Sequence, residues 1–341
     1  MKIAIIGFPG SGKSTVFSAI TDFNKEGQGK KLDSSKPSIG TVKVKDKRLE
    51  EINSVLKSKK ITPEELIFTD LPGFNLTHIR DAETLMHVVG VFSGRDYIKD
   101  IENMETEFMI SDLAIIEKKL PLLEKELMSK PSPGKELEKR VLIRCKDALD
   151  KNGVIKTLEL NADEEKSILG YCFLSQKAIF IVSNLDESQR NSNISKEITE
   201  YCKKKDLENI NLCARVESEI QALKEEERQE FAKEMGVEEL GVAKVVKTAR
   251  NIVGLITFFT GSLNGQEIKA WPIPKGMTAH DAAGKIHTDI KRGFIKAEVV
   301  AYNDFIKCGS FAEAKNKGLL RLEGKEYIVK DGDIITFKFN V

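Results

Sequence analysis

The chain has 341 residues, and its 54 Lys and Arg residues almost cancel its 53 Asp and Glu residues. This balance excludes a strong overall field that would attract nucleic acid or a membrane surface, so any such surface has to be a local patch. The five cysteines are scattered without a C-x-x-C pair, which argues against a disulfide framework or a zinc site. The first apolar run ends at Ile6, and no stretch is long enough to span a membrane. We expect a cytoplasmic protein of two or three domains.

Short apolar runs alternate with helical stretches over the first two thirds of the chain. Most of these runs are almost continuously apolar, as in the strands of a mostly parallel sheet that is covered on both faces. The sequence therefore predicts an α/β domain. The six candidate strands are Ile3–Ile6, Thr41–Val44, Leu66–Thr69, Met86–Phe92, Ala178–Ser183 and Ile210–Ala214.

The first candidate strand runs directly into the glycine-rich segment Gly7–Thr15, whose spacing is G-x-x-x-x-G-K-[ST]. Its glycines allow successive N–H groups to point at phosphate oxygens, and the helix that follows adds its positive N-terminal end. Lys13 is predicted to reach the β- and γ-phosphates as the catalytic residue, and the Ser14 hydroxyl to coordinate Mg²⁺. The sequence therefore predicts binding of a nucleoside triphosphate.

The pattern D-x-x-G follows the third candidate strand, at Asp70 and Gly73. In this pattern the aspartate reaches Mg²⁺ through water, and the glycine N–H meets the γ-phosphate. The pattern arises often by chance, and its place after an apolar strand gives it weight. Ser34 or Ser35, in a polar loop before the second strand, is a candidate to complete the Mg²⁺ shell, but a plain linker explains these serines equally well.

The segment Asn184-Leu185-Asp186-Glu187 follows the fifth candidate strand. In a guanine-selective site this position reads N-K-x-D, and the aspartate accepts two hydrogen bonds from guanine. Here Leu185 replaces the lysine and Glu187 replaces the aspartate, so the carboxylate is displaced by one methylene and an apolar side chain faces any purine. We expect Asn184, Leu185 and Glu187 to bind the base, with ATP preferred over GTP, and the turn Cys213–Arg215 to offer it a backbone amide.

A helical segment interrupts the predicted sheet domain. Its apolar residues recur at spacings of three and four, and the turn at residues 130–134 separates two such stretches, which predicts an antiparallel helical hairpin. Residues 118–156 hold eleven Lys and Arg against six Asp and Glu, which fits either a solvated outer face or a basic arm for an RNA-rich partner. The predicted seam pairs Leu113, Ile116, Leu120, Leu123 and Leu127 with Leu137, Val141, Cys145 and Ala148.

A small α+β unit is predicted from about Leu255 to the end of the chain. Thr278 and Asp281 mark the start of a short helix. The run Lys296–Val300 is a candidate strand, and Ile335–Phe339 alternates like a half-exposed strand.

With these features the chain resembles the YchF, or Obg-like ATPase, family. The resemblance rests on the N-x-x-E segment, the hairpin and the C-terminal motifs, and it spans essentially the whole chain. It implies a TRAFAC-class P-loop domain over residues 1–112 and 166–254, a coiled-coil insertion over 113–165 and a β-grasp TGS domain over 255–341. It also implies ATP hydrolysis as a switch in translation, binding to the large ribosomal subunit or the whole ribosome, and contact with RNA. Carried over by position, ATP would contact Gly10, Ser11, Gly12, Lys13, Ser14 and Thr15. We expect neither DNA nor a membrane as a partner. The C-terminal motifs include GLITFFT at 254–260, IHTD at 286–289, RGFIKAEV at 292–299 and LEGKEY at 322–327.

The chain departs from this family in three loops. One is the loop after Phe92, which is shortened and has no equivalent of the histidine often found there in the family, a suspected water-positioning group. Gly10 stands where the family has an asparagine that is linked in related enzymes to a monovalent cation. The loop after Gly73 is short, and Phe74 occupies the position of a water-orienting glutamine, so we expect slow hydrolysis that a partner accelerates. Alternatively, Asn75, Thr77 or His78 in this loop positions the water. His87 is expected to be packed rather than catalytic. The other hypotheses are a GTP-binding switch, a small-molecule kinase, and an RNA-binding adaptor with vestigial hydrolysis.

Overall fold

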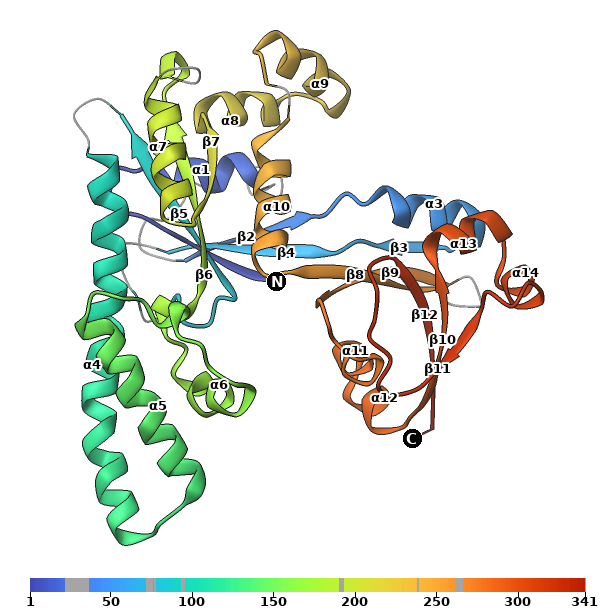
Figure 1. Ribbon diagram of the computed structural model, residues 1–341. Coiled ribbons are helices and arrows are strands. Elements are labelled where there is room, and N and C mark those ends of the chain that lie inside the picture. Colours follow the sequence, from blue (N-terminus) through green and yellow to red (C-terminus); the bar gives the residue numbers. More distant parts are fainter. Residues whose placement is uncertain are drawn as a thin grey trace. The chain divides into compact units, whose positions relative to one another are not determined.

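The computed structural model describes residues 1–21, 37–71, 76, 78–92, 96–189, 193–237, 239–261 and 266–340 (Figure 1). The chain forms two compact units. One unit comprises residues 2–40 and 67–245, and the other comprises residue 1, residues 41–66 and residues 246–341. Residues 41–66 therefore pack with the C-terminal region, a division that differs from the limits drawn from the sequence.

A six-stranded sheet, in the order β2-β4-β1-β5-β6-β7, is the frame of the first unit. The pairs β4-β1, β1-β5, β5-β6 and β6-β7 are parallel. Every residue of β5 is buried, as expected of a central strand that is covered on both faces. Each predicted strand overlaps one strand of this sheet, which confirms the predicted fold class. The bounds are β1 (Lys2–Ile6), β2 (Ser38–Lys43), β4 (Glu65–Asp70), β5 (Thr84–Val91), β6 (Ala178–Leu185) and β7 (Glu208–Leu212).

Helices α4 and α7 cover one face of this sheet. Apolar side chains of β1 and β5 pack with Met104 and Phe108 of α4, and those of β5 and β6 pack with Ile101 of α4 and Ile198 of α7. Helix α1, which begins after the glycine-rich loop, packs against α8. The helices of this region are α1 (Lys13–Ile20), α4 (Tyr97–Ser129), α7 (Asn193–Lys204), α8 (Ala214–Ala222), α9 (Glu225–Glu234) and α10 (Gly241–Ile252).

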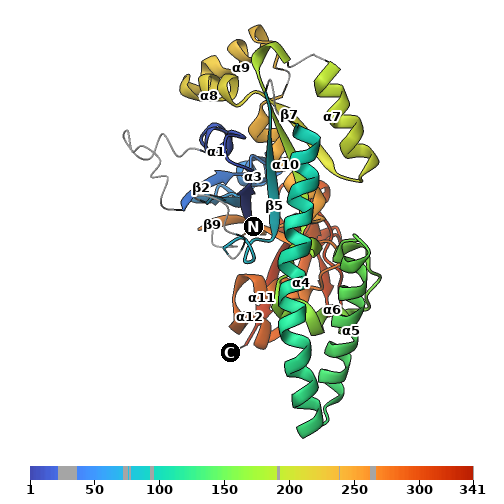
Figure 2. The ribbon, with the colours of Figure 1, turned by 90° about the vertical axis from the view of Figure 1, so that its left-hand side faces the viewer.

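The predicted helical hairpin is formed by α4 and α5 (Pro133–Asp150), which lie side by side in two perpendicular views (Figures 1 and 2). Its core contains buried Ile116 and Leu123 of the first arm and Val141 and Cys145 of the second, as the seam predicts. Helix α4 starts at Tyr97 and runs without a break past residue 113, so the inserted arm begins inside a continuous helix. The hairpin core is completed by η1 (Ile155–Thr157), α6 (Ala162–Ile168), η2 (Leu169–Tyr171) and η3 (Leu174–Gln176).

Asp112 ties the base of this hairpin to the sheet unit. Its side chain is completely buried and accepts hydrogen bonds from the backbone N–H groups of Leu174 and Ser175, at 3.0 and 2.8 Å, and from the Ser175 hydroxyl at 2.8 Å. Its carboxylate also pairs with Arg80 Nη1 at 2.9 Å, and the other guanidinium nitrogen of Arg80 donates to Ser111 Oγ at 2.6 Å. Because Arg80 follows the D-x-x-G segment, this cluster connects that part of the chain to α4.

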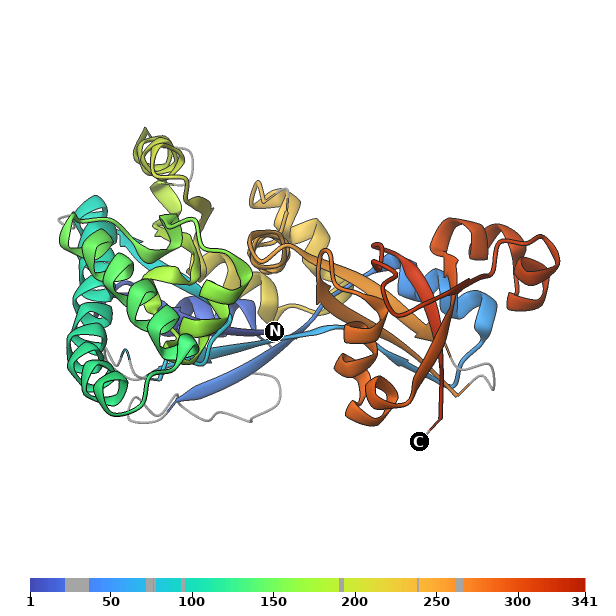
Figure 3. The same cartoon turned by 60° about the horizontal axis from the view of Figure 1, so that its bottom comes forward.

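The second unit is built on a mixed sheet in the order β11-β10-β12-β8-β9-β3, with α11 and α12 against one face (Figure 3). Buried residues from β8, β10, β12 and α11 form one core, which gives the predicted β-grasp arrangement. Strand β3 and helix α3, from residues 41–66, join this unit: Leu49 and Ile52 pack with Phe259. The elements are α3 (Lys47–Leu56), β3 (Lys60–Thr62), β8 (Leu255–Gly261), β9 (Glu267–Pro274), α11 (Ala279–Ile286), α12 (Thr288–Arg292), β10 (Phe294–Ala301), α13 (Tyr302–Cys308), α14 (Phe311–Asn316), β11 (Arg321–Glu323) and β12 (Asp333–Phe339).

Candidate nucleotide-binding site

The glycine-rich loop connects β1 to α1 at the carboxyl edge of the parallel sheet. Gly7 and Gly12 have positive φ angles of 148° and 86°, in a region that L side chains rarely adopt. A side chain at Gly12 would also collide with the amide of Asn184, and one at Gly7 would collide with the Val88 carbonyl. The loop therefore needs glycine at both positions in order to keep this compact turn.

Polar groups in the loop and at the start of α1 can receive phosphate oxygens. The first N–H groups of α1, which begins at Lys13, have no acceptor in a preceding helical turn. The Ser11 hydroxyl is buried and has no hydrogen-bond partner among the described residues. Lys13 Nζ donates to the Gly7 carbonyl at 2.7 Å and to the Phe8 carbonyl at 3.4 Å, so its charge lies over the loop. These groups fit a bound phosphate chain.

Ser14 and Asp70 form the part of the site that fits Mg²⁺. Asp70 ends β4, is 6% exposed, and shares a hydrogen bond with the Ser14 side chain. Burial raises the pKa of the Asp70 carboxyl, and the Ser14 hydrogen bond and the Lys13 charge oppose that rise. A hydroxyl and a carboxylate are oxygen donors of the kind Mg²⁺ prefers, with water and phosphate as its remaining ligands. No group of three or more His, Cys, Asp or Glu side chains suited to a metal occurs in the described part of the chain.

Three predicted site residues fall in segments to which no structure is assigned. Ser34, together with its alternative Ser35, and Gly73 lie outside the described residues. Their assignments to Mg²⁺ and to the γ-phosphate remain predictions.

A pocket of about 790 Å³ opens beside the phosphate loop. It lies at the carboxyl ends of β6 and β7, the edge at which parallel α/β sheets bind ligands. Gly12 and Thr15 of the loop line it together with the predicted base-binding segment and the 213–215 turn. The structure thus brings the predicted phosphate and base residues together around one pocket. The remaining lining residues are Phe92, Asn184, Leu185, Asp186, Glu187, Ser188, Cys213, Ala214 and Arg215.

Both polar atoms of the Asn184 side-chain amide form hydrogen bonds with backbone groups. Its Nδ2 donates to the Ser11 carbonyl at 3.2 Å, and its Oδ1 accepts from the Ala214 N–H at 3.1 Å. This side chain therefore joins the phosphate loop to the 213–215 turn. In this structure Asn184 holds the pocket walls together, a role that the sequence prediction of base contact did not include.

Leu185 differs from its prediction, because it offers almost no apolar surface to a base. It is the last residue of β6, is 2% exposed, and packs with Val91 and Ile198 in the core beneath the pocket. Glu187 is exposed in the one-turn helix η4 (Glu187–Gln189), and its carboxylate has no recorded partner among the described residues. No hydrogen bond or ion pair from the described residues fixes the carboxylate at this corner of the pocket.

Phe92 is the aromatic residue of the pocket that sequence reasoning missed. It follows β5, and its ring lies close to Gly90: a side chain at Gly90 would come within 2.8 Å of Phe92 Cε2 and 3.0 Å of Ser11 Cα. The signal in the sequence was an aromatic residue directly after the carboxyl end of a central strand, where ligands bind. His87, in contrast, is buried within β5, which confirms that it is packed.

A glycine-rich loop between β1 and α1, an aspartate at the end of the adjacent β4, and an adjoining pocket at the ends of β6 and β7 define a P-loop nucleoside triphosphatase of the GTPase-like class. A family model described as a 50S ribosome-binding GTPase matches residues 2–126, and the model YchF-GTPase_C, described as a protein of unknown function, matches residues 255–340. The chain belongs to the YchF family.

Full-length relatives establish this membership. The chain is 36% identical to the ribosome-binding ATPase YchF of Bacillus subtilis (strain 168), with 100% of both chains covered. It is 34% identical to the protein of the same name from Escherichia coli O157:H7, with 100% of this chain and 99% of the relative covered. The solved structure of the Schizosaccharomyces pombe YchF GTPase shares the fold, with a TM-score of 0.82 at 24% identity over 99% of this chain and 97% of that one. In the described part of the chain, no helix is both long and apolar enough to cross a membrane.

Proposed function

We propose that the protein is a ribosome-binding ATPase of the cytoplasm that binds Mg-ATP, hydrolyses it slowly to ADP, and acts as a conformational switch in translation. The names of its full-length relatives support the ribosome and ATP as partners. The phosphate loop supports the chemistry. Lys13 and the N–H groups at the start of α1 would bind the phosphates and offset the charge that develops in phosphoryl transfer. Ser14 and Asp70 would hold Mg²⁺, which when bound neutralises phosphate charge.

We attribute the preference for ATP over GTP to the carboxylate of Glu187. A guanine-reading carboxylate has to be held in place, because its two hydrogen bonds to guanine depend on its position. Glu187 is exposed on a one-turn helix and longer than aspartate, so holding it costs side-chain entropy. Adenine needs no such carboxylate, and Phe92 can stack on either purine. ATP should therefore bind more tightly than GTP.

Titration of both nucleotides with Mg²⁺ tests this preference. The Glu187→Asp variant should move the preference toward GTP, by up to the ~1–3 kcal/mol that a bidentate base contact is worth. Glu200→Asp makes the same exchange at an exposed residue of α7 outside the pocket lining, so it is the matched control and should leave the preference unchanged. Tighter binding of GTP than of ATP by the parent protein would favour the GTP-binding switch instead.

Slow hydrolysis is proposed because the segment after Asp70 is short and carries Phe74 where related enzymes have a water-orienting glutamine. A missing water-orienting group leaves a high barrier even when the phosphates are well bound. Single-turnover hydrolysis of ATP should therefore be slow alone and faster with ribosomes. Rapid hydrolysis by the protein alone that His78→Ala abolishes would make His78 the water-positioning residue.

A further inference from the structure

A second cavity, of about 390 Å³, lies between α4 and the sheet. Ligand pockets in proteins commonly measure about 300–1,000 Å³, so this cavity can hold a small molecule. Its wall is mainly apolar and includes Met104 and Phe108 of α4 and Ile179 and Ile181 of β6. It shares no lining residue with the nucleotide pocket, and neither cavity's lining includes a residue of the second unit.

His87 is a buried polar residue in the lining of this cavity. The residues two positions before and after it, Leu85 and Val89, pack with Met104 and Ile101 of α4, and side chains alternate along a strand. The His87 side chain therefore points toward α4, and it lines the cavity. It is 1% exposed, and neither of its ring nitrogens has a hydrogen-bond partner among the described residues.

An unpartnered imidazole in a buried apolar strand costs stability, so its presence needs a physical reason. Burial, with a smaller contribution from the Lys13 charge, lowers the pKa of His87 to about 3. The ring is then neutral at pH 7, with one nitrogen donating and the other accepting a hydrogen bond. A hydroxyl group, which both donates and accepts, is the natural partner for such a ring.

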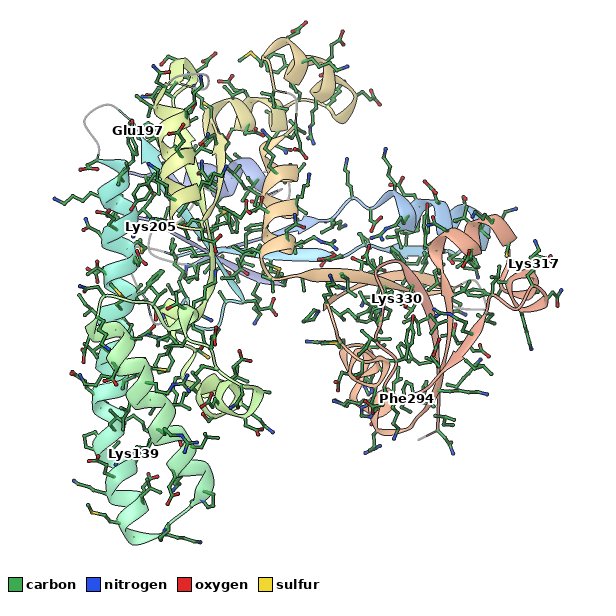
Figure 4. The ribbon with its side chains drawn as sticks, in the orientation of Figure 1. Lys139, Glu197, Lys205, Phe294, Lys317 and Lys330 are labelled. Atoms are coloured by element: carbon green, nitrogen blue, oxygen red, sulfur yellow. The ribbon has the colours of Figure 1, made fainter. Side chains whose placement is uncertain are left out.

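Three lysines line the same cavity, and Lys177 is the most enclosed. Its ammonium donates to the Ala82 carbonyl at 2.7 Å, and burial is the main cause that lowers its pKa. Lys156 and Lys205 are exposed, and Lys205 lies 3.8 Å from Glu105 of α4 (Figure 4). A carboxylate next to Lys177 would compensate the cost of burying its charge.

We propose that this cavity binds a small apolar acid that carries a hydroxyl group, with its carboxylate at Lys177, its hydroxyl at His87 and its hydrocarbon body against the apolar side chains of α4 and β6. The apolar side chains of α4 and β6 select against sugars, because several of a sugar's hydroxyl groups would be buried against them without partners. The three parts of such an acid match three features of the lining: a half-buried cation, an unpartnered imidazole and an apolar surface. Glu105 and Asp206 also line the cavity, and Glu105 pairs with Lys205.

The probe is 3-(4-hydroxyphenyl)propionate, compared with its uncharged amide and with 3-phenylpropionate, which lacks the hydroxyl. Isothermal titration of the unmodified protein should give saturable binding of the acid at millimolar concentration or below. The amide should bind about tenfold more weakly, since it carries no charge to pair with the ammonium of Lys177, and 3-phenylpropionate should also bind more weakly. In NMR spectra of protein labelled selectively on its histidines, the four histidines are the only labelled residues. The signals of His87 should shift when the hydroxylated acid is added.

Two variants test whether the acid binds in this cavity. Lys177→Met should bind acid and amide equally, whereas Lys118→Met, an exposed lysine on α4, should behave as the parent. Saturating ADP should not displace the acid, because the nucleotide pocket is separate. The proposal is wrong if the acid does not bind saturably, if Lys177→Met leaves the difference between acid and amide unchanged, or if ADP displaces the acid. None of these outcomes depends on which nucleotide the protein hydrolyses.

Discussion

Replacement of Asp112 by alanine should strongly destabilise the junction between the hairpin and the sheet unit. The side chain is 0% exposed, and its removal leaves the N–H groups of Leu174 and Ser175 and the Ser175 hydroxyl without their acceptor. It also leaves the guanidinium of Arg80, whose side chain is only 15% exposed, without its counter-charge. Removing one partner of a buried ion pair costs about 3–5 kcal/mol, and the unpaired backbone donors place Asp112→Ala toward the upper end of that range.

Chemical unfolding followed by circular dichroism measures this cost, and hydrogen exchange locates it. The amides of Leu174 and Ser175 should exchange much faster in Asp112→Ala than in the parent. Asp150→Ala removes an exposed partner of Lys146 on the same hairpin and should change stability little, which makes it the matched control. A loss of less than about 1 kcal/mol in Asp112→Ala, the level of a surface pair, would refute the reasoning that this cluster anchors the hairpin.

Three further predictions concern the nucleotide site and the hairpin. Lys13→Ala should lower ATP hydrolysis by about 10²-fold or more while the circular dichroism spectrum stays unchanged, because a charge at the phosphates is lost; an unchanged rate would exclude this loop as the catalytic phosphate site. Phe92→Ala should weaken ATP and GTP binding alike in titrations, by ~1–3 kcal/mol if the ring stacks on the base, and a loss confined to one nucleotide would contradict stacking. Lys125→Gln with Lys130→Gln should weaken ribosome co-sedimentation most at low salt, since these exposed lysines have no ion pair recorded in the described residues. Lys139→Gln is the comparison variant, because it removes an ion pair within the hairpin, at 2.9 Å to Glu124 of α4. An equal loss of ribosome binding in both variants would argue against a direct contact of Lys125 and Lys130 with RNA.

The sequence predicted those features that depend on local patterns. Most strands of the first sheet are nearly continuous apolar runs, and all six were found. The glycine spacing of the phosphate loop follows from the backbone angles that the loop needs. The hairpin seam was found because apolar residues recur at helical spacing within each arm, as Ile116 and Leu123 do in α4 and Val141 and Cys145 do in α5. Strand β3 was missed because three residues carry too little pattern, and its partner β9 lies far along the chain.

Features that depend on the partners of a side chain could not be predicted in this way. The N-x-x-E segment indicated a base site, but only the fold shows that the Asn184 amide is used on two backbone groups and that Leu185 turns into the core. A strand residue faces either the core or the ligand edge, and one residue of register decides which. At the carboxyl end of β6 the adjacent residues Asn184 and Leu185 face different surroundings. A family motif therefore locates the corner of the pocket but does not identify the atoms that would contact a base.

His87 shows the same limit from the opposite direction. Its place in an apolar run predicted that it is packed, and its burial confirms this. Packing alone favours an apolar residue there, however, because an imidazole without partners loses its hydrogen bonds to water on folding. The alternation of residues along a strand predicts on which face of the sheet a side chain lies. It does not predict whether the polar atoms of that side chain have hydrogen-bond partners. Only the three-dimensional surroundings distinguish a tolerated core histidine from one that faces a cavity with a half-buried Lys177 on its wall, and that difference makes His87 a candidate for binding a ligand.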